Sequence, residues 1–107
     1  MTKVTIYKNV KNECVGFKAF GHAGYAEEGE DIVCAGISVL TINTINSIEA
    51  LTDAEFSSEA DPKTGDLKFE LLKSTKESAL LLDAMILGLE MMADNYSEYI
   101  DLKFREV

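Results

Sequence analysis

The stretch DIVCAGISVLTINTINSIEAL, residues 31–51, is the longest segment of the chain with helical periodicity. Asp31 is a good N-cap residue, because its side chain can accept a hydrogen bond from an N–H group in the first turn. From Ile32 to about Leu51, apolar residues recur at near-helical spacing, as Val33, Ile37, Leu40, Ile45, Ile48 and Leu51. We therefore predict a largely buried helix of about five turns.

Two strands are predicted ahead of this helix. Residues 3–9 and residues 13–20 both alternate between apolar and polar side chains, as half-buried strands do. The segment from Asn9 to Asn12 reads as the turn of a hairpin. Alternation places Cys14 on the opposite face of its strand from Val15, which favours a small filler residue over a second nucleophile.

Three further strands and one more helix are predicted after residue 51, namely strand 53–60, strand 67–71, helix 75–94 and strand 99–105. Asp61-Pro62-Lys63-Thr64-Gly65 is typical of a tight turn, because proline presets φ and glycine accepts a positive φ. Ser74 and Glu77 fit a capping box ahead of the second helix. The order β-β-α-β-β-α-β indicates the α+β class, with a mixed or antiparallel sheet and two helices packed on one face.

Size and charge restrict the function classes. The chain of 107 residues is expected to form a single domain, residues 1–107. Its formal net charge of −9 repels phosphate backbones, so we expect no direct binding of nucleic acid and a basic peptide or protein as partner. The start of the chain has no apolar signal region, and no uninterrupted apolar run approaches about 18 residues, so we expect a cytoplasmic protein without membrane contact.

The cysteines do not indicate a disulfide framework or a metal centre. There are two of them, Cys14 and Cys34, and in a reducing compartment both are expected to be free thiols. A closed zinc site would have to recruit carboxylates, because the chain has a single histidine, His22. We predict no metal site and no cofactor.

The pair of His22 and Cys34 is the strongest indication of chemistry. With Asp31 as the cap, Cys34 would be the third helical residue, where N–H groups lack partners and carry the positive end of the helix dipole. A thiolate is stabilised there, and a nearby imidazole can exchange a proton with it. Ser38 lies one turn beyond Cys34 on the same helix face.

The segment between His22 and the helix is predicted to be a loop. Residues 23–30 read AGYAEEGE and fit neither the helical nor the strand period. Our hypothesis is that they form a lid over a bound peptide, with Gly24 and Gly29 as hinges. The lid residues are Ala23, Gly24, Tyr25, Glu27, Glu28, Gly29 and Glu30.

Gly21-His22 followed by Asp31-Ile32-Val33-Cys34-Ala35-Gly36-Ile37-Ser38 resembles the motif of the ribosomal-processing cysteine protease family Prp. The resemblance extends over essentially the whole chain in length and element order. It implies a dimeric α+β endopeptidase that removes the N-terminal extension of a large-subunit ribosomal protein, cutting beside a pair of aromatic residues. By position it implies Cys34 as nucleophile and His22 as base, with Gly21, Asp31 and Ser38 as supporting positions.

Two other functions remain open at this stage. A non-enzymatic acidic adaptor would bind a basic ribosomal or ribosome-assembly protein through the loop, and would tolerate a buried Cys34. A redox sensor built on Cys34 lacks a resolving cysteine close in sequence. An enzyme requires the sulfur in a groove with His22 nearby.

Overall fold

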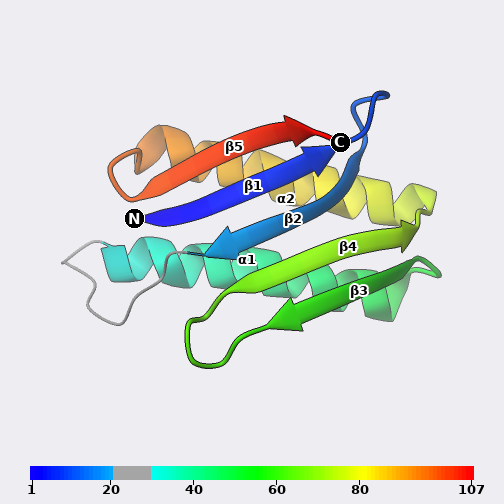
Figure 1. The fold of residues 1–107 in the computed structure, drawn as a ribbon, viewed down its shortest axis with the longest axis horizontal. Helices are drawn as coiled ribbons and strands as arrows, with labels where there is room; N and C mark the ends of the chain where they lie inside the picture. The colour runs from blue at the N-terminus through cyan, green and yellow to red at the C-terminus, as the bar shows by residue number, and fades with distance from the viewer. Residues whose placement is uncertain (21–29) are drawn as a thin grey trace.

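The computed structural model describes residues 1–20 and 30–107. Their elements are β1 (Thr2–Lys8), β2 (Cys14–Phe20), α1 (Glu30–Leu51), β3 (Glu55–Ala60), β4 (Leu67–Lys73), α2 (Lys76–Asn95) and β5 (Ile100–Glu106). The strands of this part of the chain form one sheet in the order β3-β4-β2-β1-β5 (Figure 1). β1 pairs in parallel with β5, whereas the other neighbours are antiparallel. The predicted α+β class is confirmed, and the sheet is mixed.

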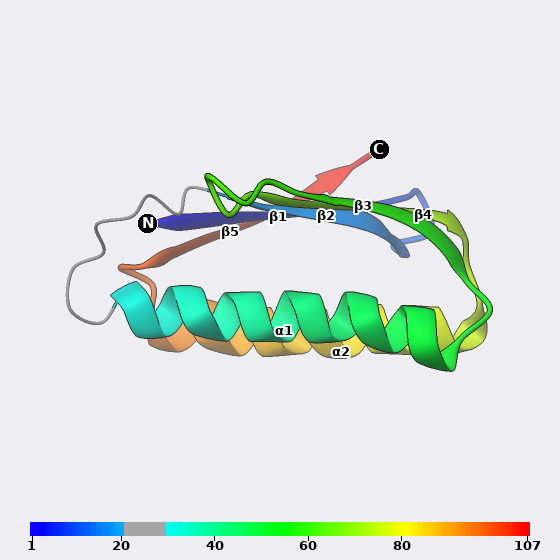
Figure 2. The same ribbon diagram turned by 90° about the horizontal axis from the view of Figure 1, so that it is seen from below.

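Both helices cover the same face of the sheet, as predicted (Figure 2). Alternation along β1 explains this arrangement, because Val4 and Ile6 are fully buried against the helices. Tyr7 alternates with them and lies on the opposite face, where the Nζ atom of Lys18 is 5.8 Å from the centroid of its ring. One face of the sheet therefore builds the core and the other remains open.

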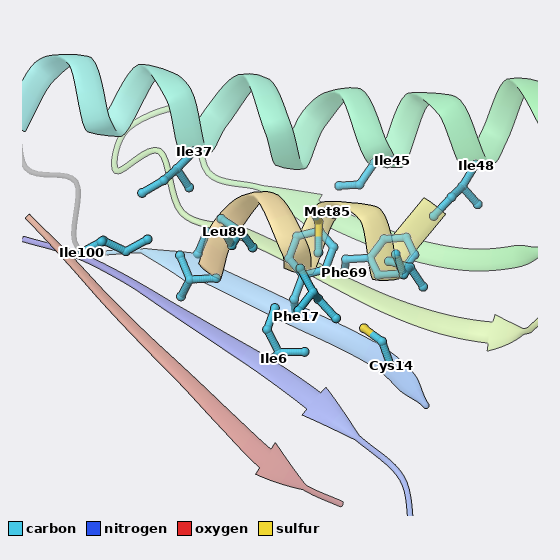
Figure 3. Close-up of a cluster of buried hydrophobic side chains, with 14 of the residues drawn as sticks. Ile6, Cys14, Phe17, Ile37, Ile45, Ile48, Phe69, Met85, Leu89 and Ile100 are labelled. Atoms are coloured by element: carbon cyan, nitrogen blue, oxygen red, sulfur yellow. The ribbon is translucent and has the colours of Figure 1, made fainter. Parts of the chain in front are cut away.

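The core lies between the sheet and the two helices (Figure 3). Phe17 of β2 and Phe69 of β4 are stacked, with their ring centroids 5.1 Å apart. Leu82 and Leu89 of α2 are fully buried against this layer. These side chains fix the plane of the sheet relative to the helices and so fix the position of each strand end.

The prediction for Cys14 was wrong about its face of β2, because the residue lies on the core face and not on the opposite one. Tyr7 pairs with Gly16 and Lys8 pairs with Cys14, so Val15 is an extra residue in β2. Such a bulge reverses the alternation of the strand, and it turns Cys14 into the core (Figure 3). Burial raises the pKa of the Cys14 thiol, whose Sγ lies 3.6 Å from the carbonyl oxygen of Gly16 and donates a hydrogen bond to it. The expectation of an unreactive filler residue agrees with this environment.

The second helix begins one residue later than predicted. Thr75, not Ser74, is the N-cap of α2, and its side chain accepts a hydrogen bond of 3.1 Å from the backbone N–H of Ser78. The Ser78 hydroxyl accepts a hydrogen bond of 2.9 Å from the Thr75 backbone in return. A serine hydroxyl thus completes the capping box that was expected from Glu77, because a hydroxyl accepts a hydrogen bond as a carboxylate does.

The helix α1 is both long and apolar. Its segment Ile32–Leu51 has a mean hydropathy of 1.4, which is in the range of membrane-spanning helices. In this fold the helix packs along the sheet, and Val33, Ile37 and Ile48 are buried there. Burial in the core therefore accounts for the apolar residues on the inner side of α1.

Candidate active site

Cys34 is the fifth residue of α1 and lies at the margin of the core. Its residue is 7 % exposed, and it is not a member of the cluster of buried hydrophobic side chains. Its Sγ atom is 2.9 Å from the Oγ1 atom of Thr2 at the start of β1. An enzyme nucleophile was expected to have its sulfur exposed in a groove. The Cys34 residue is more buried than that, because its sulfur points from α1 toward the sheet.

A groove borders the sulfur. It is lined by Cys34 and Ser38 from α1, Thr2 from β1, Phe20 from the end of β2, and Asp61 from the turn between β3 and β4. Ser38 is exposed and lies one helical turn beyond Cys34, as the sequence predicted. The structure therefore brings together a thiol, a hydroxyl and the strand end that precedes His22.

The turn between β3 and β4 forms one wall of this groove. The Gly65 backbone N–H donates a hydrogen bond of 2.7 Å to the carbonyl oxygen of Asp61, and Gly65 has a φ of 77° that favours glycine. The Asp61 carboxylate accepts a hydrogen bond of 2.8 Å from the backbone N–H of Lys63. The sequence predicted this turn, and the structure adds that the turn places Asp61 in the groove wall.

The start of α1 differs from the prediction. The helix begins at Glu30, so Asp31 is a helical residue and not the N-cap. Acidic residues are also favourable inside the first turn, because they complement the helix dipole, and this explains the shift. The helical residues whose N–H groups lack helical partners are therefore 30–32. Cys34 is two positions beyond the part of the helix that best stabilises an anion.

Several predicted site residues lie outside the described residues. These are Gly21, His22 and the proposed lid from Ala23 to Gly29. Glu30, which was assigned to the lid, is the first residue of α1. Among the residues that the structure does describe, no three His, Cys, Asp or Glu side chains are placed to hold a metal ion.

The cysteine protease Prp family model matches residues 1–101 of this chain. The chain belongs to the Prp family. It is similar to the ribosomal processing cysteine protease Prp of Bacillus subtilis, with 29 % identity over 103 residues that cover 92 % of each chain. The Prp protein of Staphylococcus aureus strain NCTC 8325 is 29 % identical over 106 residues, covering 98 % of this chain and 100 % of the relative.

Solved structures agree with this assignment. A crystal structure of Prp from S. aureus in complex with a covalently linked product peptide has a TM-score of 0.89 and 29 % identity, and covers 98 % of this chain and 100 % of the other. The crystal structure of SMU.848 from Streptococcus mutans has a TM-score of 0.89 and 31 % identity, with 100 % and 99 % covered. The chain is therefore a cysteine endopeptidase of the Prp family, which disfavours the adaptor and redox-sensor hypotheses.

Sequence reasoning missed two polar residues of the groove. Thr2 is the first residue of β1, and Val4 and Ile6 on the same face are apolar and buried. A hydroxyl at the start of this apolar face was the one sign in the sequence that Thr2 could have a polar role. Asp61 was noticed only as a turn residue. Their proximity to Cys34 depends on strand order and could not be read from local patterns.

Proposed function

We propose that this protease removes the N-terminal extension of a large-subunit ribosomal protein, with Cys34 as nucleophile and His22 as its base. The observation that carries the proposal is the position of Cys34, whose residue lines a groove beside the core cluster instead of belonging to it. The S. aureus relative has been crystallised with a covalently linked product peptide, which agrees with a reaction through an acyl intermediate.

The reaction has two steps. The proton of the Cys34 thiol passes to the imidazole of His22, and the thiolate attacks the carbonyl carbon of the scissile bond. His22 then protonates the leaving amine as the C–N bond breaks, and a thioester with Cys34 remains. Water hydrolyses the thioester, with His22 accepting its proton, and the thiol is restored when that proton returns to sulfur.

Connectivity supports the pairing of His22 with Cys34. Phe20 is the last residue of β2 and lines the groove together with Cys34. Gly21 alone separates Phe20 from His22 in the sequence. The strand that ends in the groove wall is thus followed, two residues later in the sequence, by the single histidine of the chain.

Charge supports a basic substrate. The protein has a formal net charge of −9, and the acidic residue Asp61 lines the groove. Ribosomal proteins are basic, so their extensions would be attracted while ribosomal RNA would be repelled. A ribosomal substrate would be met in the cytoplasm, which supports our proposal of a cytoplasmic protease.

Incubation with a precursor peptide tests the proposal. The peptide carries a ribosomal N-terminal extension with an aromatic pair, and a matched peptide has two alanines in place of that pair. We expect the first peptide to be cut once beside the pair and the second to be cut far more slowly, as measured by mass spectrometry. Binding of the first peptide without any cleavage would instead support the adaptor.

We also propose that the protein acts as a homodimer, as the family resemblance implies. Val39 of α1 and Met91 of α2 are 69 % and 61 % exposed and line one shallow groove between the two helices. Leu80 and Leu87 extend this apolar row along α2, each at 70 % exposure. A continuous apolar row on two adjacent helices is typical of a protein interface.

Light scattering tests the dimer directly. We expect the mass of two chains in solution, and Met91→Glu should shift the protein toward the mass of one chain, because it would bury a charge in the interface. A single-chain mass for the wild-type protein at micromolar concentration would contradict the dimer.

A further inference from the structure

The first residue of β1 is a buried polar residue beside the proposed nucleophile. Thr2 is 4 % exposed, and its backbone is held in the sheet by a hydrogen bond of 2.9 Å from its N–H to the carbonyl oxygen of Tyr99. Val4 and Ile6 share its face and are fully buried hydrocarbon. A hydroxyl at this position therefore interrupts an apolar face at the point where the face meets Cys34.

The contact between the two side chains is short. The Oγ1 atom of Thr2 lies 2.9 Å from the Sγ atom of Cys34, and either atom can be the donor while the sulfur is a thiol. A thiolate can only accept, so ionisation of Cys34 obliges the Thr2 hydroxyl to donate. A hydrogen bond to an ion is about twice as strong as one between neutral groups. The contact therefore becomes stronger when the sulfur becomes an anion.

The rest of the groove supplies no cation to the sulfur in the part of the chain that the structure describes. Its described lining includes no Lys or Arg, and Asp61 is its one charged residue. Cys34 lies two positions beyond the N–H groups of α1 that lack helical partners. The neutral donor that the described residues place against the sulfur is therefore Thr2.

We propose that Thr2 is a positioning residue for Cys34, which holds the sulfur at the edge of the groove and stabilises its thiolate by donating a hydrogen bond from Oγ1. The inference rests on Cys34 being the nucleophile. The backbone of Thr2 is fixed by β5, so the donor is in place before any substrate binds. Such preorganisation costs no rearrangement when the thiolate forms.

The pH dependence of Cys34 alkylation tests this role. Thr2→Val removes the hydroxyl and keeps the shape of the side chain, whereas Thr2→Ser keeps the hydroxyl. Iodoacetamide labelling is followed from acidic to alkaline pH, and the peptides that contain Cys34 and Cys14 are quantified separately by mass spectrometry. We expect Thr2→Val to raise the midpoint for Cys34 by about one pH unit, which lowers its labelling rate near pH 7 by up to about tenfold. Thr2→Ser should titrate like the wild-type protein.

Each outcome is decisive for the proposal. A Thr2→Val midpoint equal to that of the wild-type protein would overturn it, and so would an equal shift in Thr2→Ser, which would indicate a packing effect. Cys14 is buried in the core and reports unfolding in the same sample, because only an opened core exposes it to the reagent. Should Thr2→Val expose Cys14, Thr2→Ala replaces it in the comparison.

The experiment uses no peptide, so its failure is distinguishable from failure of the proposed function. If the wild-type protein does not cut the precursor peptide, the processing role fails while the titration of Cys34 is still measured. If the peptide is cut and Thr2→Val titrates like the wild-type protein, the protease remains and the role of Thr2 is lost.

Discussion

Replacement of Cys34 by alanine is expected to lower kcat for peptide cleavage by about 10⁴-fold or more, since a covalent route has no substitute once its nucleophile is removed. Folding should change little, because Cys34 lies at the margin of the core cluster and alanine leaves only a small space there. Cleavage is measured by mass spectrometry under saturating peptide, and the unfolding midpoint is measured in urea.

Cys14→Ala is the matched control, since it removes the other thiol by the same chemical change. Cys14 is buried among core side chains and does not line the groove. We expect Cys14→Ala to retain kcat and to lose some stability, because its cavity lies inside the core. Equal loss of cleavage in both variants would mean that the effect of Cys34→Ala is structural.

Local patterns were sufficient for the scaffold. The apolar stripe of α1 predicted a buried helix, and it packs on the sheet through Val33, Ile37 and Ile48. The proline and glycine of the turn at residues 61–65 predicted its position, since proline presets φ and glycine accepts the positive φ that Gly65 has in this turn. Alternation in the strands predicted a sheet covered on one face, because each strand has a single apolar side.

Features that depend on pairing between strands were outside the reach of those patterns. The bulge at Val15 turns Cys14 into the core, yet one extra residue leaves no mark in the alternation of a strand read alone. Thr2 meets Cys34 because β1 lies between β2 and β5 with its first residue next to the start of α1, a strand order that sequence periodicity does not specify. The chemistry of the groove thus depends on the longest-range contacts in the fold.

Helix starts are a third case, in which the sequence offered competing solutions. Asp31 is a good cap by residue type, but Glu30 and Asp31 both suit the first turn, and the helix includes them. The sequence predicted a capping box from Ser74 and Glu77, whereas Thr75 and Ser78 form the one that is observed. Residue preferences at helix ends differ by too little to choose between neighbouring positions, whereas the fit of the helix to the core does choose.

Replacement of His22 by alanine is expected to lower kcat/KM for the precursor peptide by about 10²- to 10⁴-fold, because the variant loses both the base for the thiol and the acid for the leaving amine. Two measurements separate this role from a structural one. The pH profile of kcat/KM should move to higher pH, because the thiol then has to lose its proton to solvent instead of to an imidazole. Added imidazole should restore part of the cleavage, since a free base can enter a site that has lost its own. The restored rate should saturate as the imidazole concentration rises.

The control for this prediction is Lys11→Ala, in the turn at the opposite end of β2 from the groove. Lys11 is exposed, so its removal should leave both kcat/KM and the pH profile unchanged.

Iodoacetamide labelling of Cys34 gives a second test of the pair formed by His22 and Cys34. If His22 holds the thiolate as an ion pair, labelling near pH 7 slows in His22→Ala. Full cleavage by His22→Ala at neutral pH would require a different base, and the assignment of the pair would be withdrawn.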